Sequence, residues 1–219
     1  FGATLPVVLR SFDDYKPALY LYLVIPFVAL MGITTEAVRL PSALAGIAAV
    51  FLTYFLVKLV TKRTDMALLT AFLLAISPWH IQFSRIAFEA NVGVLLNMSM
   101  VYCFLKGLRQ PKLLILAAIT AALSIYAYQS EKVFTPLLAG ILILLYAKEL
   151  LQIKKIYLVS AVVVGLLFIS PMLQYLVSNE QALTRARETS IFADKTNIAN
   201  NAIRLDADTK SGDFVGLLF

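Results

Sequence analysis

Residues 77–91 read Ser77-Pro-Trp-His-Ile-Gln-Phe-Ser-Arg-Ile-Ala-Phe-Glu-Ala-Asn91 and separate two long apolar runs. Ionisable side chains at the end of a membrane span are costly unless they are solvated, paired or used in function. Arg85 and Glu89 are four residues apart, so on a single helix they would share a face and could pair. His80 is the only histidine in the chain. The stretch therefore predicts a polar turn with membrane helices arranged around it.

The composition is that of an integral membrane protein. The chain has 219 residues, 60% of them hydrophobic and 15% charged, and its mean hydropathy is +0.83. Soluble domains of this length do not carry so many apolar residues in such long runs. The net charge of +6 would suit nucleic acid, but the basic residues lie in short connections between apolar runs, which is a topology signal. Nucleic acid is therefore excluded as a partner.

Six apolar stretches are predicted to cross the membrane as helices, each with boundaries good to a few residues. They cover about 37–60, 66–84, 89–106, 112–128, 134–150 and 155–177. An earlier stretch, 17–32, is shorter than the roughly 20 residues that a span needs and is rich in tyrosine. We predict an interfacial or re-entrant helix pair there, with a full crossing as the alternative. The predicted fold class is an all-α, polytopic transmembrane helix bundle.

Two shorter features complete this prediction. Lys16 precedes Pro17, so we expect extended backbone at Lys16 and the proline in the first turn of a helix. The single cysteine, Cys103, lies in an apolar run and is predicted to be a small buried hydrophobe.

The basic residues orient the six predicted spans. The connections after the first, third and fifth spans hold nine of them, whereas the alternate connections hold only Arg85 and Lys132. The nine are Lys58, Lys62, Arg63, Lys106, Arg109, Lys112, Lys148, Lys154 and Lys155. The positive-inside rule places these nine in the cytoplasm. Residues 77–91 and the Glu131-Lys132 pair are then expected on the outer side.

We expect three parts in the chain, which we interpret as a piece of a longer protein. Residues 1–36 would be the end of a first extracytoplasmic loop with juxtamembrane helices, 37–177 the six-span bundle, and 178–219 an extracytoplasmic loop. The chain begins at Phe1 without an initiator methionine and stops directly after an apolar Val215–Phe219. Both ends therefore predict further sequence beyond them.

Polar residues on the predicted outer side are the candidates for a functional site. Chemistry on a phosphate-linked substrate needs cations to hold the phosphate and a carboxylate to move a proton or to bind a metal. The alternative is that these are ordinary loop charges, that His80 is a satisfied interfacial histidine, and that Tyr128 belongs to an aromatic belt. The candidates are Asp14, Lys16, His80, Arg85, Glu89, Asn91, Tyr128 and Lys132.

Three stretches, taken in order, resemble the GT-C class of polytopic glycosyltransferases. They are Arg10-Ser-Phe-Asp-Asp-Tyr-Lys-Pro-Ala-Leu-Tyr20, Ala37-Val-Arg-Leu-Pro-Ser-Ala-Leu-Ala-Gly46 and residues 77–91. The chain is most similar to the bacterial branch related to protein O-mannosyltransferases and the lipid A aminoarabinose transferase. The resemblance covers most of residues 5–192. It implies a bacterial cytoplasmic membrane protein whose active site faces outward.

The resemblance also implies roles for single residues. Lys16 matches a lysine expected near the donor phosphate, and Lys132 falls where related enzymes place another lysine. Glu89 aligns with the second acidic position of the family and has Arg85 as its neighbour. Other members have Asp where this chain has Glu89, so a divalent metal ion is left open. The catalytic base of such enzymes is an acidic residue in the first outer loop, and the resemblance places it ahead of Phe1.

The expected activity is transfer of a sugar from a polyprenyl-phosphate donor to a hydroxyl acceptor of unidentified class. We expect the configuration at the anomeric carbon to be inverted, and membrane lipid to surround the enzyme. A polymerase or ligase of surface polysaccharide is the nearest alternative among enzymes. A transporter or flippase of lipid-linked sugars would need ionisable groups near mid-membrane, and the predicted spans offer almost none. A non-catalytic membrane protein is the remaining alternative.

Overall fold

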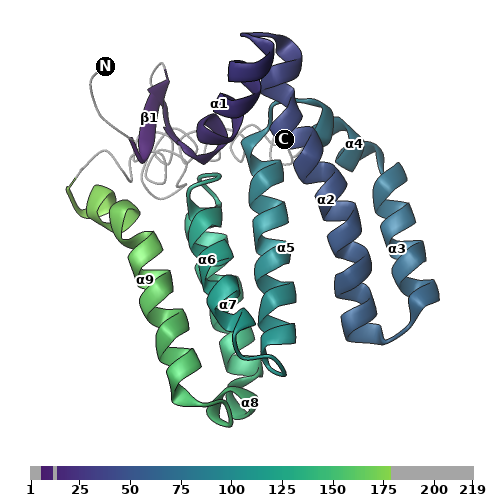
Figure 1. The fold of residues 1–219 in the computed structure, drawn as a ribbon, viewed down its shortest axis with the longest axis vertical. Coiled ribbons are helices and arrows are strands. Elements are labelled where there is room, and N and C mark those ends of the chain that lie inside the picture. The colour runs from purple at the N-terminus through teal and green to yellow at the C-terminus, as the bar shows by residue number, and fades with distance from the viewer. Residues whose placement is uncertain (1–5, 12–13, 179–219) are drawn as a thin grey trace, which may run out of the picture. The chain divides into compact units, whose positions relative to one another are not determined.

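The computed structural model describes residues 6–11 and 14–178 (Figure 1). The compact unit described below ends at Gln174. The predicted loop 178–219 lies, apart from Ser178, outside the described residues. The elements are β1 (Val8–Ser11), β2 (Asp14–Pro17), α1 (Leu19–Met31), α2 (Thr35–Thr61), α3 (Thr64–Ile76), α4 (Pro78–Arg85), α5 (Glu89–Gly107), α6 (Leu113–Ile125), α7 (Glu131–Leu145), α8 (Ala147–Leu151) and α9 (Lys155–Ser178).

The fold is mostly helical, as predicted, but it opens with a short β-hairpin that the all-α prediction did not include. Strands β1 and β2 are antiparallel, and Leu9 lies opposite Lys16 in their register. Lys16 is therefore in extended backbone, as its position before Pro17 predicted. Pro17 ends β2 instead of lying in the first turn of α1, so that part of the prediction was wrong.

The stretch 17–32 forms one helix, α1, and the predicted helix pair was wrong. Pro26 lies inside α1 without ending it. The 13 residues of α1 rise only about 20 Å, which is less than the roughly 30 Å thickness of a bilayer core. Its length therefore suits a helix that does not cross the membrane.

Each predicted span coincides with a helix or a bent pair of helices, but six crossings are not confirmed. Among the described residues, α2 and α9 are long and apolar enough to cross a membrane, and α3 with α4 would be a third span if the bent pair counts as one. Helices α6 and α7 have 13 and 15 residues, and α5 has polar residues along its length. The apolar runs thus predicted the approximate positions of the helices more accurately than the residues at which each helix begins and ends.

A 57° bend separates α3 from α4 at the start of residues 77–91. Pro78 is the first residue of α4, and Ser77 before it has extended backbone (φ −64°, ψ 123°). Proline lacks an N–H and disfavours helical backbone in the preceding residue. The chain therefore turns at Ser77 and carries α4 away from the α3 axis.

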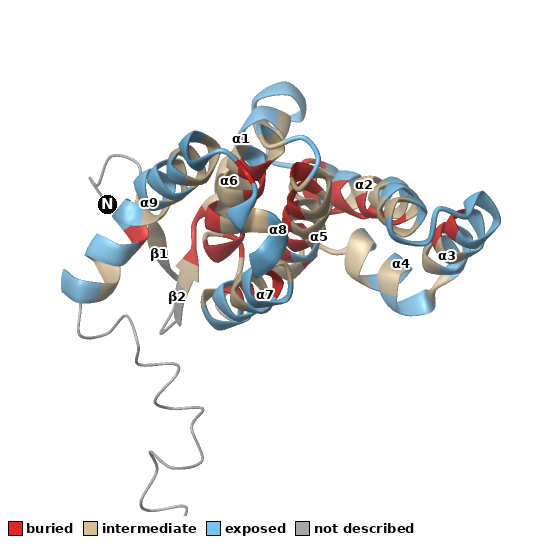
Figure 2. Ribbon diagram, turned by 90° about the horizontal axis from the view of Figure 1, so that it is seen from below, coloured by how far each residue is buried: buried red, intermediate tan, exposed pale blue. Residues whose placement is uncertain are grey.

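Small residues on one side of α2 allow α4 and α5 to approach it closely. The buried positions of α2 are Ala37, Pro41, Ser42, Ala45, Gly46, Ala49 and Thr53. Close approach over small residues is a usual way for membrane helices to associate. Figure 2 shows buried residues on α2, α5 and α6, and exposed residues along α3 and α9. Many of the exposed residues are large and apolar, for example Phe72 and Leu167, as expected of a surface that faces lipid.

Two clusters of buried apolar side chains hold the described part of the bundle together. One, which includes Met100, Phe104 and Leu142, joins α5, α6 and α7. Cys103 is buried in it, as predicted. The other, which includes Tyr20, Ala45 and Val92, joins α1, α2 and α5. The second cluster lies at the end of the bundle that carries the candidate site.

We predict that Gly46→Val destabilises the protein. A Cβ atom at Gly46 would clash with Oγ of Ser84 and would lie 2.7 Å from Cβ of Ser84, so α4 would have to move away from α2. Overpacking of this kind typically costs about 1–3 kcal/mol. The thermal unfolding midpoint of the full-length protein in detergent measures the loss, and Ser84→Gly should recover part of it.

Gly140→Val is the matched control, because a Cβ atom at Gly140 would meet nothing within 4 Å. The same change of residue type should leave its midpoint close to that of the wild type. Equal losses in the two variants would show that the close contact between α2 and α4 does not limit stability.

Candidate functional site

Lys16 and Glu89, both predicted site residues, lie next to each other. Nζ of Lys16 is 3.8 Å from Oε1 of Glu89, and the two side chains are 44% and 22% exposed. A partly exposed ion pair contributes only about 0–1 kcal/mol, so the stability of the fold does not require this contact. Glu89 is the first residue of α5, where the helix dipole favours a carboxylate. A cation and a carboxylate thus meet at an accessible end of α5.

Hydrogen bonds around the start of α1 set the position of Lys16. The N–H of Ala18 donates to the carbonyl oxygen of Val7 (3.1 Å), which closes the base of the hairpin. The N–H of Leu19 donates to the carbonyl oxygen of Tyr126 (3.1 Å), and Oη of Tyr20 donates to that of Val38 (2.8 Å). The hairpin is therefore attached to the end of α6 and to α2.

The buried side chain of Asn91 sets the position of Glu89, two residues before it. Its Nδ2 donates to the carbonyl oxygen of Ser42 (2.8 Å) and lies 3.3 Å from Oγ of Ser42 and 3.5 Å from Oγ of Ser84. Oγ of Ser42 in turn donates to the carbonyl oxygen of Phe83 (3.0 Å). Asn91 therefore joins α2, α4 and α5, and its amide is used in packing.

Arg85 and Glu89 do not share a helix face, because the helix is interrupted between them. Arg85 is the last residue of α4, and Ile86 has extended backbone (φ −100°, ψ 159°). The pairing of Arg85 with Glu89 that a single helix would allow is therefore not formed. Glu89 instead pairs with Lys16. Arg85 is exposed, and no ion-pair partner lies within reach of it in the described part of the chain.

His80 is satisfied by the backbone of α2. Its Nε2 lies 3.1 Å from the carbonyl oxygen of Gly46. A carbonyl oxygen only accepts, so Nε2 carries the proton and donates it in this contact. This fits the alternative of a satisfied interfacial histidine and leaves His80 with a packing role between α4 and α2.

An aromatic row runs from Trp79 to Tyr128. The ring centroids of Trp79 and Phe83 are 5.6 Å apart, those of Phe83 and Phe88 4.9 Å, and those of Phe88 and Tyr128 5.9 Å. The first two pairs are stacked, with interplanar angles of 24° and 21°. Phe88 directly precedes Glu89 in the sequence, so the row passes the start of α5.

The other predicted residues are less closely tied to this pair. Lys132 lies in the first turn of α7 and is half-buried, and no contact joins it to Lys16 or Glu89 within the described residues. Asp14 is opposite Ser11 in the hairpin, and its side chain lies outside what the structure describes. Among the described residues, no three side chains of His, Cys, Asp or Glu gather as a metal site would require.

Glu131 was predicted only as part of a charged pair on the outer side, and the structure gives it a distinct place. Its side chain is buried, and its Oε2 accepts a hydrogen bond from Nδ2 of Asn97. Oγ1 of Thr135 lies 3.2 Å from the same carboxylate oxygen, 3.0 Å from Oδ1 of Asn97 and 2.7 Å from Oγ of Ser124. This buried polar cluster joins α5, α6 and α7.

The cluster lies directly below the ion pair along α5. A Cβ atom at Gly93, one turn after Glu89, would come within 2.8 Å of Oε1 of Glu131. A side chain at this position would force the Glu131 carboxylate to shift. The spacing of Glu89, Gly93 and Asn97 by four residues is the sequence signal that could have revealed a polar face on α5.

Comparison with known proteins identifies the family to which the chain belongs. Residues 15–175, more than half of the chain, match the sequence model of the family described as "Dolichyl-phosphate-mannose-protein mannosyltransferase". The matched segment begins just before Lys16 and includes Glu89 and Glu131. No solved structure matches the chain.

A curated relative is "Putative mannosyltransferase YycA" of Bacillus subtilis (strain 168). The two are 30% identical over 145 residues, which is 64% of this chain and 21% of the relative. The chain thus spans about a fifth of the relative's length. The match over residues 15–175 decides the assignment: this chain belongs to the dolichyl-phosphate-mannose-protein mannosyltransferase family of membrane glycosyltransferases.

Proposed function

We propose that the protein transfers a sugar from a polyprenyl-phosphate donor to a hydroxyl acceptor at the outer face of a bacterial cytoplasmic membrane. The observation that carries the proposal is the accessible Lys16–Glu89 pair, with Nζ and Oε1 3.8 Å apart. A donor of this type has a phosphate that needs a cation and a sugar that needs orientation. Family membership supports the reaction class.

The proposed orientation follows from the basic residues. Lys62, Arg109 and Lys154 lie near one end of the bundle, and Glu89 lies at the opposite end of α5. We place the first end in the cytoplasm by the positive-inside rule, and all six apolar segments in the membrane. Residues 1–36 then form the end of an outer loop, 37–177 the bundle, and 178–219 a further outer loop.

The proposed reaction is a single displacement with inversion. An acceptor hydroxyl loses its proton to a base and attacks the anomeric carbon, while the bond from that carbon to the phosphate oxygen breaks. The polyprenyl phosphate leaves with the bonding electrons. Because the leaving group is already an anion, the enzyme chiefly supplies orientation and positive charge. We place the base in sequence outside these 219 residues.

Within this chain we assign the donor phosphate to Lys16. Its side chain is partly exposed, and its present partner, Glu89, can be exchanged for phosphate at little cost to stability. Glu89 orients the lysine, the acceptor or a divalent metal ion. Arg85 and Lys132 are secondary candidates for the phosphate. The aromatic row from Trp79 to Tyr128 offers flat apolar faces against which a sugar ring or an isoprenoid chain can pack.

We predict that Lys16→Ala and Glu89→Gln each lower sugar transfer by the full-length protein. Removing one group that stabilises transition-state charge typically costs about 100- to 1,000-fold in rate, and we expect a loss near the lower end for Lys16→Ala. Because the two side chains are in contact, the double variant should be less impaired than the product of the two losses. Turnover is measured with a polyprenyl-phosphate sugar.

Glu36→Gln is the matched control for the carboxylate, since Glu36 is an exposed acid in the first turn of α2. Lys155→Ala is the control for the lysine, at the opposite end of the bundle. Near-normal turnover in Lys16→Ala and Glu89→Gln would refute the assignments. Losses that equal those of the two controls would do so as well.

The buried cluster below the pair gives a separate prediction about stability. Glu131→Ala leaves the amide of Asn97 without its carboxylate acceptor, which typically costs about 1–3 kcal/mol. Glu131→Gln keeps an acceptor of the same shape and should lose less. Thermal unfolding midpoints in detergent test this, and a wild-type midpoint for Glu131→Ala would contradict the supporting role of the cluster.

A further inference from the structure

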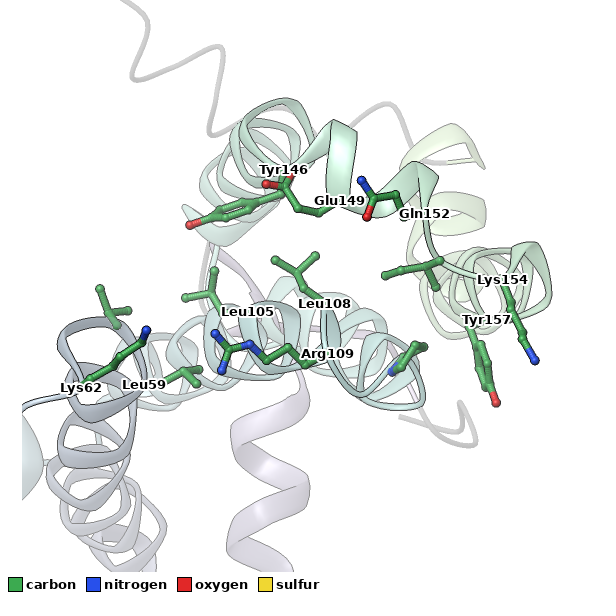
Figure 3. A pocket seen from close by; sticks show the side chains of 13 residues that line it. Leu59, Lys62, Leu105, Leu108, Arg109, Tyr146, Glu149, Gln152, Lys154 and Tyr157 are labelled. Carbon is green, nitrogen blue, oxygen red and sulfur yellow. The ribbon is translucent and has the colours of Figure 1, made fainter.

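A cavity of about 820 Å³ lies at the end of α5 far from Glu89 (Figure 3). The 19 residues of α5 rise by about 27 Å, so this cavity is separate from the ion pair. Its walls come from the ends of α2 and α5 and from the segment that joins α7 to α9. Nothing in the proposed transfer reaction uses it.

Three cations from three separate segments line this cavity. Lys62 follows α2, Arg109 lies between α5 and α6, and Lys154 precedes α9. Figure 3 shows Lys62 and Arg109 extending toward the same region on one wall, with Tyr146 and Glu149 on the facing wall. Glu149 is the one carboxylate among the lining residues, so the described walls carry a net positive charge.

The cations of the cavity are not neutralised by the protein. Within the described residues, none of Lys62, Arg109 and Lys154 forms an ion pair. Arg63, next to Lys62 in sequence, differs because it binds the carboxylate of Asp65. That hydrogen bond raises the pKa of the Arg63 guanidinium above its ordinary value. In the described part of the chain, these three cations therefore have no carboxylate partner, and a bound anion would supply one.

Apolar surface accompanies the charge. Leu59, Leu105 and Leu108 are among the lining residues.

We propose that this cavity binds an anionic phospholipid, with its phosphate headgroup beside Lys62 and Arg109 and an acyl chain on the apolar walls that Leu59, Leu105 and Leu108 provide. A soluble phosphate would use the cations but leave the apolar walls uncovered. Basic cavities between membrane helices on the cytoplasmic side are a known mode of headgroup recognition. The combination of unpaired cations and apolar walls in one cavity matches an amphiphile. The inference does not depend on the sugar-transfer reaction.

The test is lipid binding to the full-length protein in detergent, followed by native mass spectrometry with phosphatidylglycerol or phosphatidylcholine. The variant Lys62→Gln/Arg109→Gln/Lys154→Gln should bind phosphatidylglycerol at least roughly tenfold more weakly, given the contribution expected of each cation. Its binding of phosphatidylcholine should change little. Unchanged phosphatidylglycerol binding would overturn the proposal.

The control variant is Lys112→Gln/Lys148→Gln/Lys155→Gln. It removes the same charge from the same end of the bundle, but none of its residues lines the cavity. It should bind phosphatidylglycerol nearly as the wild type does. A loss as large as that of the cavity variant would overturn the proposal in favour of a diffuse effect of surface charge.

Two further measurements distinguish a bound lipid from a bound soluble phosphate and provide a test that does not depend on the charge variant folding correctly. Leu59→Trp fills the cavity without changing any charge, and it should weaken phosphatidylglycerol binding by a similar factor; unchanged binding would count against the cavity. Glycerol phosphate, which has the headgroup chemistry without acyl chains, should fail to displace the lipid. Displacement at equal concentration would identify a soluble phosphate as the occupant and would refute the lipid.

Discussion

The buried amide of Asn91 is the contact on which the position of the candidate site depends. It donates to the carbonyl oxygen of Ser42 and reaches the hydroxyl of Ser84, so one side chain joins α2, α4 and α5. Leaving a buried polar group without a partner typically costs about 1–3 kcal/mol, so these three helices are tied to one arrangement. Glu89 begins α5 two residues earlier, and its place at the end of the bundle follows from this junction.

The partner of Glu89 comes from a different part of the chain and is positioned by different contacts. Lys16 is held in a hairpin whose base is attached to the end of α6 through Leu19 and Tyr126. The hydrogen bonds of Asn91 and those of the hairpin therefore bring together an ion pair that itself contributes little to stability. Below the pair, Glu131 and Asn97 connect α5 to α7. A site that binds an anionic donor requires a cation in a defined position whose present partner the donor phosphate can replace. The Lys16–Glu89 pair meets both requirements.

The sequence predicted the helical class and the location of each apolar segment, because long apolar runs report burial in lipid or protein directly. It did not predict where the helices end. Residues 126–130 continue an apolar run in part, yet α6 stops at Ile125 and α7 starts at Glu131. The interruption between Arg85 and Glu89 contains no glycine or proline, so no local signal separated α4 from α5.

The candidate site, too, was predictable where its contacts join sequence neighbours and was not predictable where they join residues far apart in the chain. Lys16 and Glu89 are far apart in sequence, and no periodicity relates them; the charge pattern placed both on the outer side, and the resemblance to a family gave both a role at one site. Glu131 stands beside Lys132 and therefore had the pattern of a loop charge, whereas its burial depends on Asn97, which lies 34 residues away and which only folding brings near. Trp79, Phe83 and Phe88 are close in sequence, but Tyr128 joins their row through tertiary packing.

The most direct measurement is the structure of the full-length protein with a non-transferable polyprenyl-phosphate sugar analogue bound in a lipid nanodisc. We expect the donor phosphate within hydrogen-bonding distance of Nζ of Lys16, with Glu89 beside the sugar, the lysine or a metal ion. A donor phosphate bound elsewhere, with the contact between Lys16 and Glu89 still intact, would contradict it.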